Sequence, residues 1–170
     1  MSEDDVDRIR SEWATVRPEL DTTALEMSGR ILRSAALVMR HGDVHLATFG
    51  LTRGEFDILA ALRRAGRPRS PGTLRTISLA TGPSTTKRLR SLEARGAVQR
   101  TPNPADARGA LISLTPAGVA LVDAVFPGIL AIEAGLLVGV PHGEAAGVVE
   151  ALRTVMASIQ SADAAGVNAP

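Results

Sequence analysis

Cysteine and tyrosine are absent from this 170-residue chain, and aromatic side chains make up only 2% of it. The lack of cysteine excludes disulfides and thiolate metal sites. Scarce aromatics argue against a surface that binds single-stranded nucleic acid by stacking on its bases. No apolar run approaches the ~20 residues that a membrane span needs, and the N-terminus, MSEDDVDR, is acidic, unlike a signal peptide. We therefore expect a cytoplasmic protein without a membrane partner.

Motifs typical of enzymes are also missing. Ser, His and Asp all occur, but no nucleophile elbow or pair of carboxylates is present, and the scattered glycines form no phosphate loop. His41 and His45 have the i, i+4 spacing that can bind a metal, but no third ligand lies nearby in the sequence. We expect no catalytic residues, no metal site and no cofactor, and we interpret both histidines as solvated residues near a helix end.

The stretch from Ser70 to Thr115 carries the pattern that organises the chain. It predicts a helix, a turn, a second helix and two short strands over 97–100 and 110–114. The polar loop from Thr101 to Gly109, rich in Pro, Asn, Asp and Arg, would join the strands as a wing. This order is a winged helix-turn-helix, so the predicted fold class is mainly α with a small β-wing.

The second helix of this unit has the layout of a recognition helix. Thr81 or Gly82 can cap it, Pro83 suits its first position, and Gly96 ends it. An advance of about 100° per residue predicts a core-facing side with Thr85, Leu89 and Leu92, and places Arg88 at its border. The opposite side carries hydrogen-bond donors for phosphates and base edges, namely Ser84, Thr86, Lys87, Arg90 and Ser91. The major-groove contacts that we expect come from Ser84, Thr85, Thr86, Lys87 and Arg90.

The wing predicts a second contact with DNA. Arg108 lies near its tip, where an arginine can enter a narrow minor groove. Asp106 is a poor DNA contact and is expected to hold Arg108 or a cation of the recognition helix. Arg63, Arg64 and Arg75 would add positive charge toward the DNA backbone.

Charge is distributed very unevenly. Between Thr52 and Thr115 twelve Lys and Arg face four Asp and Glu, a net charge of +8, whereas the rest of the chain carries −7 and the whole chain +1. A basic middle between acidic ends is typical of a nucleic-acid-binding region on a frame that does not bind.

The ends of the chain predict amphipathic helices. One covers residues 4–16, a second runs from the cap Asp21 to about His45, and a third begins at Thr52 with Glu55 completing a capping box. After the wing, Pro116 opens a long helix kinked at 127–128, and Pro141 opens a last one. We expect residues 1–50 and 116–170 to be dimerisation helices around a DNA-binding region, 51–115. A homodimer would match a pseudo-palindromic site with half-sites ~10 bp apart.

Three motifs in this order give the chain a resemblance to a known family: RLRSLEARG, the DAR of the wing, and LTPAG at a helix start. From Leu51 to Leu121 the sequence resembles the MarR family of bacterial transcription regulators. The resemblance implies a homodimer that binds double-stranded operator DNA, usually as a repressor, and releases it when a small ligand binds between the head and the dimerisation helices.

Within that family, GPSTTKR and an extra N-terminal helix with a tryptophan resemble the urate-responsive branch. The resemblance implies an effector site formed by Trp13, Asp57 (in EFDIL), Arg88 (in TTKRL) and Arg100 (in AVQR). Arg88 at the edge of the apolar side, and Arg100 on the strand face of Val98, would be semi-buried cations in need of an anion. Urate, a planar anion, could accept from both.

Other interpretations of these residues stay open at this stage. Asp57 could pair with Arg88 or Arg100 to hold the head together, and Trp13 could be a core residue. Paired arginines would equally suit a small carboxylate, and a regulator without a ligand is a further alternative. In a different function class, the winged helix would serve as a protein-interaction module.

Overall fold

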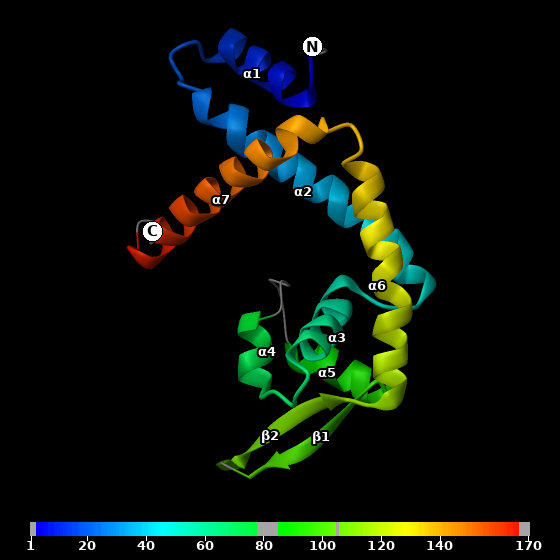
Figure 1. Cartoon of the computed structure of the whole chain (residues 1–170). Helices are drawn as coiled ribbons and strands as arrows, with labels where there is room; N and C mark the ends of the chain where they lie inside the picture. Colours follow the sequence, from blue (N-terminus) through cyan, green and yellow to red (C-terminus); the bar gives the residue numbers. More distant parts are fainter. Residues whose placement is uncertain (1–2, 78–84, 105, 167–170) are drawn as a thin grey trace. The chain divides into compact units, whose positions relative to one another are not determined.

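The structure, a computed structural model, describes residues 3–77, 85–104 and 106–166. Contacts divide the chain into two compact units, residues 1–133 and 134–170. The described residues form helices and one antiparallel pair of strands, the mainly α architecture with a β-wing that the sequence predicts. In chain order the elements are α1 (Asp5–Val16), α2 (Thr23–Thr48), α3 (Arg53–Ala65), α4 (Pro71–Ile77), α5 (Thr85–Ala94), β1 (Val98–Asn103), β2 (Asp106–Leu114), α6 (Pro116–Leu136) and α7 (His142–Ala164) (Figure 1).

Helix α1 packs along α2 through an apolar contact at Val6 and a set of ion pairs. Asp4 caps α1 by accepting hydrogen bonds from the backbone N–H groups of the first turn. Val6 is buried against Gly29 of α2, where a Cβ would lie 3.0 Å from it. Arg30 of α2 reaches back to Asp4 at 2.8 Å and to Asp7 at 2.7 Å. The N-terminal helix is therefore an ordered layer on α2.

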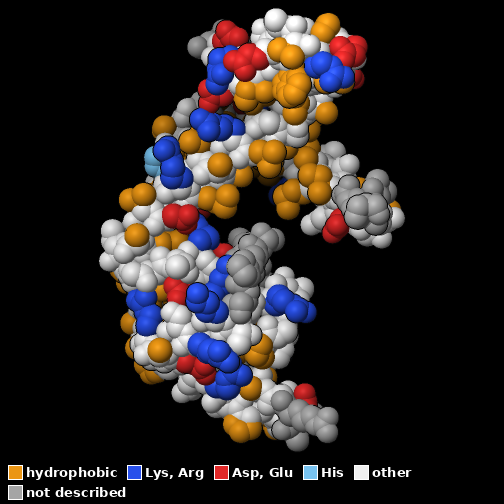
Figure 2. Space-filling model, turned by 180° about the vertical axis from the view of Figure 1, so that it is seen from behind, with side chains coloured by type: hydrophobic (Ala, Val, Ile, Leu, Met, Phe, Trp, Pro, Cys, Tyr) orange, Lys and Arg blue, Asp and Glu red, His pale blue; other side chains and the backbone are white. Residues whose placement is uncertain are grey.

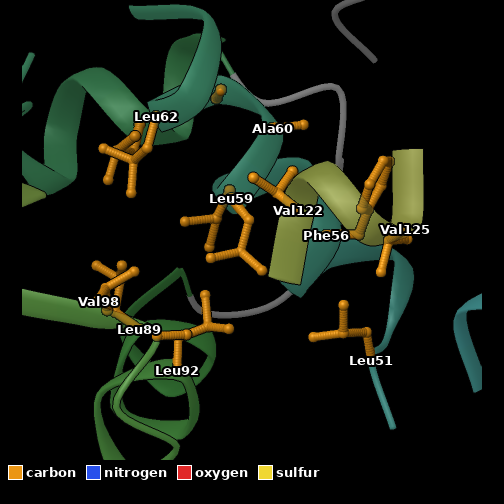
Figure 3. Packing of buried hydrophobic residues seen from close by; sticks show 14 of the residues in the cluster. Leu51, Phe56, Leu59, Ala60, Leu62, Leu89, Leu92, Val98, Val122 and Val125 are labelled. Carbon is orange, nitrogen blue, oxygen red and sulfur yellow. The ribbon is translucent and has the colours of Figure 1, made fainter. Parts of the chain in front are cut away.

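We call the DNA-binding region, residues 51–115, the head. Its hydrophobic core is centred on α3. Thr52 and Glu55 form the predicted capping box, and Gly66 ends the helix in a left-handed conformation with φ 60°. Leu59 of α3 is fully buried and lies among side chains from α5, β1 and α6 (Figure 3). The cluster includes Leu51, Phe56, Leu62, Leu89, Leu92, Val98, Val122 and Val125. Thus α3 is the element on which α5 (the reading helix), the wing strands and α6 all pack.

The wing strands are longer than the sequence predicts. They pair from Val98 opposite Leu114 to Pro102 opposite Ala110, and then Asn103 pairs with Asp106 across a register shift. Most of the expected loop is therefore strand, since β1 extends to Asn103 and β2 begins at Asp106. The strand pairing is irregular here, with a register shift between Pro102 and Asn103.

A close backbone approach joins the wing to α6. Thr115 donates to the carbonyl of Gly96 at 2.6 Å and accepts from the N–H of Gly118 at 3.0 Å. A Cβ at position 118 would lie 1.9 Å from the carbonyl oxygen of Ala97. The motif LTPAG is thus a capped helix start whose glycine admits the neighbouring backbone.

Helix α6 corrects one sequence-based expectation. The helix is 21 residues long and contains an 18-residue stretch with a mean hydropathy of 1.9, so by length and composition it is sufficient to cross a membrane, although the sequence suggested no such run. Its apolar side chains Val122, Val125 and Ile129 pack in the core of the head, and Asp123 forms a bidentate pair with Arg63 of α3 at 2.8 and 2.9 Å. One side of α6 therefore packs on the core, while Phe126 and Leu130 on it remain exposed. The helix also continues through Pro127.

Helix α7 belongs to the second unit and has no buried residue. It begins after Pro141, as predicted. Large apolar side chains remain exposed along it, namely Val148, Val149, Leu152, Met156 and Ile159.

The substitution Gly118→Ala tests the contact between α6 and the wing. Because the new methyl group would overlap the Ala97 carbonyl, we expect the free energy of unfolding to fall by about 1–3 kcal/mol, measured by urea denaturation. Gly135→Ala is the control in the same helix, since nothing lies within 4 Å of a Cβ there. It should leave stability unchanged or raise it by up to about 1 kcal/mol. Equal effects of the two changes would contradict the close approach.

Candidate nucleic-acid interface and effector site

The reading helix α5 presents a polar side to solvent. Leu89 and Leu92 are fully buried, whereas Thr86, Lys87 and Arg90, on the opposite side, are exposed. Thr85 is half-buried, in agreement with its position beside the core. Ser84 and the predicted cap residues 81–83 lie outside the described residues. The described part of α5 therefore has the two-sided layout that the sequence predicts.

Basic side chains gather over the head, and apolar ones are exposed along the terminal helices (Figure 2). Arg64 and Arg75 are exposed, as a role in backbone contacts requires. Arg63, by contrast, has its guanidinium fork engaged by both carboxylate oxygens of Asp123. Arg63 thus joins α3 to α6, and its contact with a DNA phosphate stays a prediction.

The wing residues are only partly described. Arg108 lies in β2 rather than in a loop, and its side chain is outside the described part. The carboxylate of Asp106 lies beside Gly109, where a Cβ would be 2.9 Å from Oδ2. Gly109 thus makes room for Asp106 inside the hairpin.

A second polar side of α5 faces the corner between α2 and α3. The guanidinium of Arg88 lies against the backbone of α3 at Gly54, where a Cβ would come within 2.3 Å of it. Ser91 hydrogen-bonds to Glu55, a carboxylate only 6% exposed. Ser91 therefore contacts the scaffold, not the solvent side on which the sequence placed it. In the helical periodicity Ser91 lies close to the border between the core-facing and the solvent-facing sides of α5.

Arg95 extends the same side of α5 toward the end of α2. Its Nη2 donates to the carbonyl of Phe49 at 2.8 Å, and its Nη1 donates to the carbonyl of Gly50. These carbonyls lie at the C-terminal end of α2. Carbonyls at such an end have no N–H partner within the helix and attract a cation. Sequence analysis missed this residue, although Arg88, Ser91 and Arg95 have the i, i+3, i+7 spacing of one helix face.

Two carboxylates of α3 have opposite pKa shifts. Burial would raise the pKa of Glu55, but hydrogen bonds from Ser91 and Thr52 and the charge of Arg95 hold it below its usual value. Burial raises the pKa of Asp57, and the charges of Arg53, Arg88 and Arg64 only partly oppose this. Asp57 is 8% exposed, and within the described residues no side chain forms an ion pair with it. It is a buried carboxylate whose negative charge is incompletely compensated.

The structure brings together two of the four predicted effector residues. Asp57 and Arg88 lie close enough for the arginine to act on the carboxylate pKa. Trp13 is 45% exposed and lines a hollow with Glu12 and Val16 of its own helix, so it is not a core residue.

Arg100 does not point inward as the strand pattern suggested. It shares the face of Val98, but its long side chain reaches Glu93 of α5 at 3.3 Å and stays 41% exposed. Long cationic side chains can leave an apolar face in this way and keep the charge in water.

His45 also differs from its predicted environment. Its ring packs on Gly128 of α6, where a Cβ would lie 2.3 Å away, and its Nε2 is 3.1 Å from the carbonyl oxygen of Val125. Phe49 contacts the ring edge-on at 5.2 Å between centroids. The interpretation as a solvated residue therefore holds for His41, which is exposed, but is wrong for His45, which joins α2 to α6.

Comparison with known proteins assigns this chain to a family. A family model described as MarR family matches residues 49–109. The HTH-type transcriptional regulator PecS of Dickeya dadantii is 35% identical over 123 residues, which cover 71% of this chain and 74% of PecS. The chain belongs to the MarR family.

Solved structures of MarR proteins share the fold. Wild-type apo MarR from E. coli, at 25% identity, superposes with a TM-score of 0.64 over 75% of this chain and 95% of that chain. A mutant MarR from E. coli complexed with operator DNA has a TM-score of 0.66 at 23% identity, over 84% of this chain and 96% of that chain. The match of the MarR family model ends within the wing, so it includes α3, α5 and the hydrogen-bonded corner between them.

The opposite shifts of Glu55 and Asp57 predict opposite effects of neutralising them in this MarR protein. Glu55→Gln should lower the free energy of unfolding at pH 7 by about 1 kcal/mol, because charge-assisted hydrogen bonds are lost. Asp57→Asn should raise it, because a buried carboxylate charge is removed.

The pH dependence gives the control for this pair. A carboxyl group whose pKa is lowered by folding stabilises the fold above its unfolded-state pKa, and this stabilisation is lost as the pH falls through the folded-state pKa. A carboxyl group whose pKa is raised by folding stabilises the fold at acid pH, and this stabilisation is lost as the pH rises. Thermal unfolding of both variants and the wild type between about pH 2.5 and pH 7 tests this. The difference for Asp57→Asn should shrink as the pH falls toward 3.8, and the difference for Glu55→Gln should shrink only below 4.5. The same sign of change for both variants would contradict the assignment.

Proposed function

We propose that this MarR-family regulator represses transcription by binding a pseudo-palindromic operator as a homodimer. The observation that supports the proposal best is the division of α5 into a buried side and an exposed polar side with Thr86, Lys87 and Arg90. Hydroxyl and cationic donors on an exposed helix are the groups that contact phosphates and base edges in a major groove. Ser84, Thr85 and Arg108 complete the proposed contact set from the sequence. This function involves no catalysis and is carried out in the cytoplasm.

Exposed apolar surface on the terminal helices supports the homodimer. On α7, Val148 is 45% and Met156 59% exposed, and on α2, Leu32 is 70% exposed. Large apolar side chains exposed in a group along one helix mark protein contacts. A second copy that buries them would present two reading helices related by a two-fold axis, as a pseudo-palindromic operator needs.

Titration of operator DNA with Arg90→Ala tests the interface. We expect the variant to lose about 1–3 kcal/mol of operator affinity, measured by fluorescence anisotropy, because Arg90 lies on the exposed side of α5. Arg153→Ala, an exposed arginine on α7, is the control and should bind like the wild type. Arg108→Ala is expected to lose a similar amount through the minor groove.

The salt dependence of the wild type separates this proposal from a protein-interaction module. About ten phosphate contacts per dimer give a steep loss of affinity with rising salt. Weak binding that is insensitive to salt would favour the interaction module and overturn the DNA interface. Binding of one chain per duplex would overturn the homodimer.

For the effector, we propose a small anion at Asp57 and Arg88, such as urate or a small carboxylate. A guanidinium packed against α3 lies near a buried carboxylate that forms no ion pair in the described part of the chain. A planar anion with N–H donors, such as urate, would accept hydrogen bonds from the Arg88 guanidinium and donate them to the Asp57 carboxylate. Because Arg88 belongs to the reading helix, a ligand that moves it would change the position of α5 and so the affinity for DNA.

Calorimetry with urate and with citrate on wild type and Arg88→Ala tests the effector site. Binding to the wild type that Arg88→Ala abolishes, together with weaker operator binding in the presence of the ligand, is the expected result. Trp13→Ala and Arg100→Ala show whether the two residues outside the pair contribute. Absence of binding by both ligand classes would leave a regulator without this sensor.

A further inference from the structure

The reading helix is connected to the N-terminal frame by a polar contact set that is separate from its DNA-facing side. We call the side chains of Arg88, Ser91 and Arg95 the polar seam of α5. They meet Gly54, Glu55 and the carbonyl groups at the end of α2. The three positions lie within about 60° of one another on a helix of about 100° per residue. The exposed donors Thr86 and Arg90 lie on the opposite side, and the exposed Lys87 lies between that side and Ser91.

Arg95 is the member of the polar seam that reaches past α3 to the preceding helix. Its two terminal nitrogens donate to the successive carbonyls of Phe49 and Gly50. Gly50 follows the C-cap Phe49 of α2 and has φ 63°, a left-handed conformation that glycine adopts readily. The planar guanidinium therefore binds a pair of adjacent carbonyls whose arrangement depends on α2 ending here, before the chain enters α3.

Glu55 of α3 takes part in the same set of contacts. It is 6% exposed, caps α3 through Thr52 at 2.9 and 2.8 Å, and accepts from Ser91 of α5. The positive charge of Arg95 lies near enough to lower the pKa of the Glu55 carboxyl. One buried carboxylate thus ties the start of α3 to the middle of the reading helix, and Arg95 ties the end of α2 to its C-terminal turn.

We propose that Arg95 is a positioning residue for operator recognition, which orients α5 through the Phe49 and Gly50 carbonyls without contacting DNA. The proposal rests on the proposed function. Hydrophobic contacts of Leu89 and Leu92 hold α5 against α3 but are not directional, so they fix its distance better than its rotation. The bidentate bonds of Arg95 are directional and fix the rotation that brings Thr86, Lys87 and Arg90 to base edges.

The variant Arg95→Lys isolates this role, because it keeps the positive charge and loses the fork that spans two carbonyls. Affinities of wild type and variant are measured by anisotropy for operator and for random duplex at several salt concentrations. We expect operator affinity to fall about tenfold, the size of one lost specific contact, while random-duplex affinity and its salt dependence stay as in the wild type. Arg153→Lys on α7 is the matched control and should change neither affinity.

Each other outcome has a distinct meaning. Equal losses on operator and random duplex, or a smaller salt dependence, would make Arg95 a phosphate contact and overturn the proposal. Unchanged operator affinity would overturn it as well. If Arg95→Lys unfolds, as judged by thermal melting, Glu55→Gln, which weakens the hold on Ser91, must lower the ratio of operator to random affinity, or the proposal fails. A wild type that binds no DNA would refute the proposed function instead, so the two failures are distinguishable.

Discussion

Leu89 and Leu92 are fully buried on one side of α5, and Ser91 and Arg95 contact the α2–α3 corner from a second side. A helix held on two sides has one side left for a ligand, and in α5 that side carries Lys87 and other donors. The other parts of the head serve this arrangement. Helix α3 supplies the packing surface, and the wing follows directly at Gly96, where a φ of 67° reverses the chain.

Glycines and polar side chains form the joints between helices in this protein. Arg53 lies on Gly42 of α2, Arg88 on Gly54 of α3, and His45 on Gly128 of α6. In each case a flat polar group occupies the space that a Cβ would fill, so two helices approach closely and are joined by directional contacts. These directional contacts hold the helices that carry α5 in one arrangement relative to one another.

The parts of the fold that depend on local sequence were predictable. Thr52 and Glu55 form their capping box within one helical turn, and the buried positions of α5 follow from the helical period alone. Contacts that depend on distant segments were not. The reach of Arg100 to Glu93, the packing of His45 on α6 and the acceptors of Arg95 all require knowing where two elements end relative to each other. Asp57 and Arg88 can be selected for the proposed effector site by residue type alone, but the burial of Asp57 without an ion pair in the described part of the chain was not predictable.

The central claim is that two outward-facing α5 helices read one operator. Hydroxyl-radical footprinting on duplexes selected from a random pool tests it most directly. We expect two protected segments on one face of the duplex, with their centres about one helical turn, ~10 bp, apart, and a two-fold symmetric consensus. Failure to select any common sequence, or a single asymmetric footprint, would contradict the claim.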